Sequence, residues 1–191
     1  MKKSYKTNLY LALIHYPVVN RNGEVIASAV TNLDLHDISR AAKTYGVRSF
    51  YVVTPLSDQK ILANKIVSHW LKGAGARYNP KRREALKLIR IKNALDEVIN
   101  HIHEIGGAFP KTVVTSAGRN SGNISFKQFR EILQDGNLYL LIFGTGWGLP
   151  KDFMAKADYA LDPISGNTDY NHLSVRSAAA IVLDRLFGRD E

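Results

Sequence analysis

Short apolar runs alternate with amphipathic stretches along the whole chain. The first apolar run covers residues 9–16, and residues 34–45 then place apolar side chains at helical spacing. Runs rich in β-branched and aromatic residues predict strands, whereas apolar residues spaced three or four positions apart predict helices with one buried face. Repeated alternation of the two is typical of an α/β fold, a mainly parallel sheet with helices on both faces. The predicted strands are 9–16, 25–30, 49–53, 85–91, 112–115, 139–143 and 159–161, and the predicted helices are 34–45, 57–71, 93–105, 125–133 and 171–187.

Length and composition predict one domain over residues 1–191. A chain of 191 residues is long enough to bury a core, and it contains no linker or low-complexity tract. The sequence has no cysteine, which excludes disulfides and thiolate zinc sites and suits a reducing cytoplasm. Because His15 interrupts the short apolar run near the N-terminus, that run predicts a strand rather than a signal peptide or membrane span. We therefore expect a cytoplasmic protein with no membrane partner.

The charge balance indicates an anionic partner. Lysine and arginine total 26 against 17 acidic residues, a formal net charge of +9. Nucleic acid is the leading candidate, anionic lipid is the second, and solubility alone is the remaining interpretation. Basic residues concentrate in residues 72–92, with Tyr78 among them and Trp70 just before them. This composition suits a phosphate backbone with a stacked base, and a solvated loop is the alternative.

Three loops that follow predicted strands are candidates for ligand contact. Ligands of open parallel sheets bind outside the carboxyl ends of the strands. The loop at residues 114–120 has small side chains, and the glycines of residues 144–149 permit close approach and left-handed turns. Within that second loop, Trp147 can stack on a planar ring or cover a pocket. In the third loop, residues 164–174, the backbone can bind a base and Asn171 can cap the next helix.

The glycine-rich loop differs from two common nucleotide-binding motifs. No Lys-Ser or Lys-Thr pair follows its glycines, so it is not a phosphate-binding P-loop. Pro150 stands where the helix of a dinucleotide fingerprint would begin, and the loop lies late in the chain. The remaining structural interpretation is a tight glycine turn under a packed tryptophan.

Three segments, in the expected order, resemble the SPOUT superfamily of S-adenosylmethionine-dependent RNA methyltransferases. Residues 30–46 resemble the first motif, with Arg40 on its helix. Residues 141–148 are similar to the glycine-rich second motif, and residues 164–180 are similar to the third. The resemblance implies a C-terminal trefoil knot, which nothing in composition or periodicity suggests. It also implies S-adenosylmethionine as cofactor, tRNA or rRNA as substrate, and a homodimer. The alanine-rich face of residues 177–180 agrees with a last helix near the dimer interface.

The resemblance implies a cofactor held mainly by backbone groups of the three loops. Arg40 resembles the arginine that places the RNA phosphate or activates the acceptor, and Asp169 in the third loop can accept a proton. Asp34 and His36 can accept it from the opposite loop, with helix capping as their alternative role. The predicted catalytic residues are Arg40 and Asp169, and the implied cofactor-binding residues are Thr115, Ser116, Ala117, Gly144, Thr145, Gly146, Trp147, Gly148, Leu149, Ile164, Gly166, Asn171, Leu173 and Ser174.

The sequence leaves the substrate open. Thr145 and Trp147 stand where ribose-modifying members often carry Asn-Glu, and the signature of the tRNA guanine-N1 branch is not evident. The RNA, the nucleotide and the acceptor atom, ring nitrogen or ribose oxygen, therefore stay undetermined. We expect no metal, because His101 and His103 lie two apart on a predicted helix and point apart. A non-catalytic RNA-binding module and a metabolite-binding α/β protein are the alternative functions.

Overall fold

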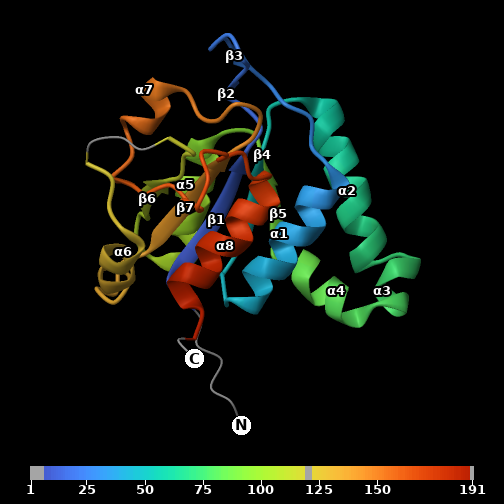
Figure 1. Ribbon diagram of the computed structural model, residues 1–191. Helices are drawn as coiled ribbons and strands as arrows, with labels where there is room; N and C mark the ends of the chain where they lie inside the picture. Colours follow the sequence, from blue (N-terminus) through green and yellow to red (C-terminus); the bar gives the residue numbers. More distant parts are fainter. Residues whose placement is uncertain (1–6, 119–121, 190–191) are drawn as a thin grey trace.

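A computed structural model describes residues 7–118 and 122–189 of the chain (Figure 1). At its centre is a six-stranded sheet in which every neighbouring pair of strands is parallel. The predicted α/β class with a mainly parallel sheet is thus confirmed. From one edge to the other, the strands are β5 (Ile89–Lys92), β4 (Phe50–Val53), β1 (Leu9–Ile14), β7 (Tyr139–Gly144), β6 (Lys111–Val114) and β8 (Tyr159–Ala160).

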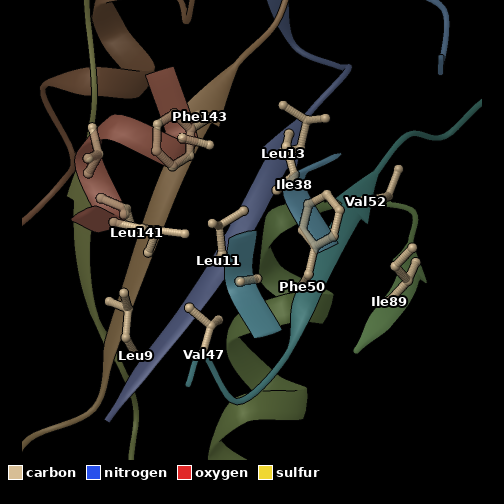
Figure 2. Packing of buried hydrophobic residues seen from close by; sticks show 14 of the residues in the cluster. Leu9, Leu11, Leu13, Ile38, Val47, Phe50, Val52, Ile89, Leu141 and Phe143 are labelled. Carbon is tan, nitrogen blue, oxygen red and sulfur yellow. The ribbon is translucent and has the colours of Figure 1, made fainter. Parts of the chain in front are cut away.

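Strand β1 lies inside the sheet and is buried along its whole length. Its odd-numbered residues face one apolar cluster and its even-numbered residues face another. Burial on both faces is the reason why this strand is a continuous apolar run rather than an alternating one. In register, Leu11 lies between Phe50 of β4 and Leu141 of β7. Figure 2 shows Phe50 beside Ile38, and Leu11 and Leu141 belong to the same first cluster.

Helices cover both faces of the sheet, as predicted. The first cluster takes apolar side chains from five helices, and the second takes them from two. The helices over the first cluster are α1 (Asn32–Thr44), α2 (Ser57–Leu71), α4 (Pro80–Leu86), α6 (Phe126–Ile132) and α8 (Val175–Phe187), and those over the second are α5 (Leu95–Gly106) and α7 (Lys151–Met154). A further short helix, α3 (Ala74–Tyr78), packs against α2 and α4.

Several segments differ from their predicted conformation. Of the strand predicted at residues 25–30, only β3 (Val25–Ile26) forms, and it pairs antiparallel with β2 (Val18–Val19) in a hairpin separate from the main sheet. The strand predicted at 85–91 is wrong over its first half, because helix α4 continues to Leu86 and β5 begins at Ile89. Burial of Ala85 and Leu86 as the inner face of a helix explains the apolar pair that suggested a strand.

The last helix begins later than predicted. Ser174 is its N-cap, with Oγ accepting a hydrogen bond from the Ser177 backbone N–H at 3.3 Å. The expected cap, Asn171, lies outside the helix and instead donates from Nδ2 to the Ala117 carbonyl oxygen at 2.7 Å. A serine hydroxyl one residue before the helix reaches the free N–H groups, which Asn171 is too far away to do. The expected trefoil knot concerns chain threading, and it stays a prediction.

Candidate functional site

The carboxyl ends of the central strands open into one cleft of about 980 Å³. Strand β1 pairs with β4 on one side and with β7 on the other, and the chain continues from β1 to β4 but from β7 to β8 on the opposite side of the sheet. In an open parallel sheet, ligands bind outside the carboxyl ends of the strands at the point where the strand order reverses in this way. The walls are the loops after β6, β7 and β8, the hairpin, and the first turns of α1 and α8. The volume suits a small organic ligand.

The glycine-rich loop after β7 needs its glycines. A Cβ added to Gly144 would lie 2.9 Å from Leu149 Cγ and 3.0 Å from Leu149 N, closer than real Cβ contacts. Gly146 and Gly148 have φ values of 61° and 104°, in the left-handed region that other residues rarely adopt. The loop therefore turns tightly at its three glycines, all of which line the cleft.

The β2–β3 hairpin supports this loop. The Trp147 backbone N–H donates to the Val19 carbonyl at 3.0 Å, and the Val19 N–H donates to the Gly148 carbonyl at 2.9 Å. The indole of Trp147 is 62% exposed and lies edge-on to His172, with ring centroids 6.5 Å apart. Trp147 is thus placed at the mouth of the cleft, where a planar ligand ring can meet it.

The first and third loops are joined to each other. The Asn171–Ala117 hydrogen bond, 2.7 Å long, connects the loop after β6 to the segment before α8. Thr115 Oγ1 donates to the Ile142 carbonyl at 3.0 Å, and Ser116 Oγ accepts from the N–H two residues on at 3.1 Å. Because these side chains are bonded within the protein, the loops offer mainly backbone groups to a ligand. The predicted loop residues 119 and 120 lie outside the described part of the chain.

The cleft brings together the predicted cofactor-binding residues with one exception. Gly166 is exposed on the third loop, outside the lining, and so is the predicted catalytic residue Asp169. Arg40 is exposed on α1, also outside the lining. The roles of these three residues stay predictions. The residues that do line the cleft are Thr115, Ser116, Ala117, Gly144, Thr145, Gly146, Trp147, Gly148, Leu149, Ile164, Asn171, Leu173 and Ser174.

A buried histidine beneath the cleft was not predicted as part of the site. His15 follows β1, is fully buried, and places Nδ1 3.0 Å from Ser28 Oγ. Ser28 in turn bonds to the hydroxyl of Thr145, which donates to the Ile14 carbonyl at 3.0 Å. Burial lowers the pKa of His15 to about 4, although nearby Asp34 acts in the opposite direction. The imidazole is therefore neutral at pH 7 and holds Ser28 and Thr145 in the cleft wall.

An ion pair joins the two helices that border the cleft. Asp34, in the first turn of α1, is buried, and its Oδ2 accepts from the hydroxyl of the N-cap Thr31 at 2.6 Å. Arg176, in the first turn of α8, places NH1 3.6 Å from Asp34 Oδ1 and Nε 3.7 Å from Asp37 Oδ2. Sequence reasoning missed Arg176, because its partners lie far away along the chain.

The basic segment predicted as a loop is helical over much of its length. It contains α3 and α4, and α4 packs against α1. The Arg82 guanidinium covers the Trp70 ring at 4.6 Å, so this tryptophan packs within the protein and is not presented for stacking. Tyr78 is 86% exposed, and Lys81 and Arg83 are exposed on α4. The segment thus presents a tyrosine and cations on helical supports.

Comparison with known proteins identifies the family. The model of a family described as SAM-dependent RNA methyltransferase matches residues 8–188. This chain belongs to that family. The match covers the glycine-rich loop, both helices of the ion pair and the basic segment. The predicted RNA methyltransferase activity and S-adenosylmethionine cofactor are thereby confirmed at the level of the family.

This methyltransferase covers most of one relative and less than half of another. It is 41% identical over 184 residues to an uncharacterized protein of Aquifex aeolicus, covering 96% of this chain and 90% of that protein. It is 43% identical over 181 residues to a protein named tRNA (guanine-N(1)-)-methyltransferase of Oleidesulfovibrio alaskensis, covering 95% of this chain and 42% of that relative. This chain therefore spans less than half of the second relative.

A solved structure supports the SPOUT fold of the methyltransferase. The A. aeolicus TrmH/SpoU tRNA modifying enzyme is 16% identical, with a TM-score of 0.54 over 94% of this chain and 74% of that one. Identity this low shows the fold alone. Together with the family match, it confirms the predicted resemblance to SPOUT methyltransferases.

The cleft of the methyltransferase fits the cofactor of its family. A nucleoside needs apolar contact for its base and hydrogen-bonding groups at the base edge. Leu149, Ile164 and Leu173 supply apolar surface, and the glycine turns expose the main chain beside them.

Within the described ranges, no group of three or more His, Asp or Glu residues is placed to hold a metal ion. No helix of the same ranges is both long and apolar enough to cross a membrane.

Proposed function

We propose that this methyltransferase modifies tRNA, with S-adenosylmethionine bound in the cleft. The observation that carries the proposal is the cleft itself, which three loops at the carboxyl ends of parallel strands line together with the hairpin and the first turns of α1 and α8. The tRNA assignment draws on the name of the Oleidesulfovibrio relative. The proposal stops at tRNA and does not include the guanine N1 atom, because this chain spans only 42% of that relative.

The cleft residues divide the work between binding and orientation. S-adenosylmethionine supplies a methyl group on a positively charged sulfur, which an acceptor displaces in line. We assign the adenosyl group to the loops containing Gly146 and Leu173, where it is shielded from water by Trp147 at the mouth. His15 and Thr145 fix the wall beneath it by hydrogen bonds through Ser28.

The RNA surface of the proposal runs from α1 over α4 to α3. Arg40 is exposed on α1, and α4 packs directly against that helix (Figure 1). Lys81 and Arg83 continue the positive charge, and Tyr78 adds an exposed ring. Cations position a phosphate backbone, and an aromatic side chain can stack on an unpaired base. Arg40 is the member of this surface that we place nearest the reacting nucleotide.

We further propose that the protein is a cytoplasmic homodimer. The absence of cysteine suits a reducing compartment. Along α8, Ser177 is exposed and Ala178 and Ala180 are half-buried, so small side chains there permit close approach of a second subunit. Light scattering of the purified chain would return twice the mass of one chain if the dimer forms, and the mass of one chain if it does not.

Methyl transfer to fractionated RNA tests the proposed substrate. Tritiated S-adenosylmethionine is incubated with the protein and with tRNA or rRNA from a strain that lacks the gene. We expect label in the tRNA fraction, because its target nucleotide is unmodified in that strain. The matched control is tRNA from the parent strain, which should accept little label. Label in rRNA alone, or in neither fraction, would contradict the tRNA proposal.

A further inference from the structure

Asp34 carries a carboxylate oxygen that the fold buries without a hydrogen bond. The side chain is 9% exposed, and it lines the cleft. Its Oδ2 is used by the Thr31 hydroxyl at 2.6 Å, whereas Oδ1 accepts no hydrogen bond from the described residues. The nearest cationic group is the Arg176 guanidinium, 3.6 Å from Oδ1. That distance allows charge attraction but exceeds a normal hydrogen bond.

Such an oxygen calls for a partner from outside the chain. A buried acceptor left unpaired is costly, and the cost is larger for a charged group. The helix cap is formed by the Thr31 hydroxyl, which accepts from the Asp34 N–H and donates to Asp34 Oδ2. Capping therefore does not use Asp34 Oδ1. The second oxygen, Oδ1, therefore has no hydrogen-bonding role in α1, and Asp34 is one of the residues that line the cleft.

The charged and titratable groups around Asp34 do not form a hydrogen bond with its Oδ1 atom. Arg176 on α8 lies between Asp34 and Asp37 and offsets part of their negative charge. His15, on the side of β1, stays neutral because burial lowers its pKa to about 4. The histidine therefore brings no positive charge that would pair with Asp34 permanently.

We propose that Asp34 is the catalytic base that takes the proton of the methyl acceptor. The proposal rests on the proposed function and deepens it. In the transfer step, the lone pair of the acceptor atom forms the bond to the methyl carbon. The carbon–sulfur bond breaks, its electron pair stays on sulfur, and the acceptor proton passes to Asp34 Oδ1. The substrate class is consequently an RNA nucleotide whose acceptor, a ring N–H or a ribose O–H, carries a proton.

Asp34 also has a geometric advantage over Asp169. Asp169 is exposed outside the cleft lining, whereas Asp34 lies in the wall formed by the first turn of α1. A general base must reach the proton that it removes, and exclusion of water strengthens its interaction with that proton. Asp34 therefore replaces Asp169 as the group to test first.

The test compares three isosteric variants in the tritium assay with undermodified tRNA and rRNA. Asp34→Asn removes the base and keeps an oxygen for Thr31, Asp37→Asn removes the other carboxylate next to Arg176, and Asp169→Asn removes the earlier candidate. We expect Asp34→Asn to lower kcat by about 100-fold or more, the usual contribution of a general base. Asp37→Asn should keep kcat near wild type, and Asp169→Asn should lower kcat less than Asp34→Asn does.

Two further measurements separate catalysis from structure. Calorimetry should give Asp34→Asn the wild-type affinity for S-adenosylmethionine, because the carboxylate acts on the RNA side of the reaction. Asp34→Glu, which restores a carboxylate, should be more active than Asp34→Asn, and circular dichroism checks that both variants fold.

Three results would overturn the proposal. In the first, Asp34→Asn keeps its kcat. In the second, Asp37→Asn loses as much activity as Asp34→Asn, which would indicate a role in holding Arg176 alone. In the third, Asp34→Glu is less active than Asp34→Asn, which would indicate that the size of the side chain, and not its carboxylate, determines activity. Wild-type protein that labels neither tRNA nor rRNA would overturn the proposed function and this inference together, whereas label transferred equally by wild type and Asp34→Asn overturns only the inference.

Discussion

His15 shows how one buried side chain can organise a loop far away in the chain. Its Nδ1 lies 3.0 Å from Ser28 Oγ, and Ser28 bonds to Thr145 in the glycine-rich loop. Thr145 also donates to the carbonyl of Ile14, the last residue of β1. The cleft wall is thus tied to the centre of the sheet by a chain of polar groups, and such groups are costly to leave unpaired.

The lowered pKa of His15 predicts a pH dependence of stability. In the unfolded chain its pKa is the ordinary 6.5, whereas in the folded protein it is about 4. As the pH falls below 6.5, the unfolded state binds a proton that the folded state does not, so stability is lost. The full loss by pH 4 is roughly 3 kcal/mol.

Urea unfolding between pH 7 and pH 4 measures this contribution. The wild-type protein should lose roughly 3 kcal/mol more over that range than His15→Asn, which keeps a polar group near Ser28 but has no proton to gain. Parallel stability curves for the two proteins would show that His15 does not titrate as its burial requires.

The sequence predicted the site residues that lie in loops after strands. It did not predict the site residues that form pairs between distant segments of the chain. Gly144 and Gly146 were predicted to contact a ligand because their loop follows an apolar strand, and the family resemblance implied Asn171; the structure places all three in the cleft lining. The pairing of Arg176 with Asp34 depends on how α8 packs beside α1. Such packing brings distant residues together, and no pattern along the chain records it.

At the scale of elements, amphipathic patterns located the long helices and missed the short helices α3, α4 and α7. Helix α4 buries only Ala85 and Leu86, which is too few apolar positions for a helical period to emerge. Its start did carry a signal, since Asn79 accepts a capping bond from the Arg82 N–H and Pro80 occupies the first helical position.

The helical form of this segment sharpens a prediction about RNA binding. Replacing Lys81 and Arg83 by glutamine removes two exposed charges and leaves Arg82, which packs on Trp70, in place. Affinity for tRNA should fall, and the slope of log K against log salt should flatten by about one to two units, because fewer counterions are released.

Filter binding at several salt concentrations measures that slope. The matched control replaces Lys127 and Lys156, two exposed lysines outside the α3–α4 segment, and should leave the slope closer to wild type. If both double variants change the slope equally, the positive charge acts through the whole surface, and α4 is not a docking site.

At the scale of the whole molecule, the order of strands creates the site. Strand β1 comes first in the sequence and lies inside the sheet, with β4 and β5 on one side and β7, β6 and β8 on the other. In the main sheet the chain continues from β1 to β4 on one side and from β7 to β8 on the other, and the cleft is lined by the hairpin after β1, the loops after β6, β7 and β8, and the first turns of α1 and α8. The alternation of apolar and amphipathic stretches predicted the layers of this fold. It could not predict the strand order, because pairing between β1 and β7 is decided by contacts between distant segments.

The central claim is that the backbone of the loops after β6 and β7 and before α8 encloses the adenosyl group. A crystal structure of the protein with S-adenosylmethionine tests this claim most directly. We predict the adenosyl group in the cleft, with main-chain groups of residues 144–149 and 171–174 at hydrogen-bond distance from it. An adenosyl group bound elsewhere, with side chains filling the space between these loops, would contradict the account.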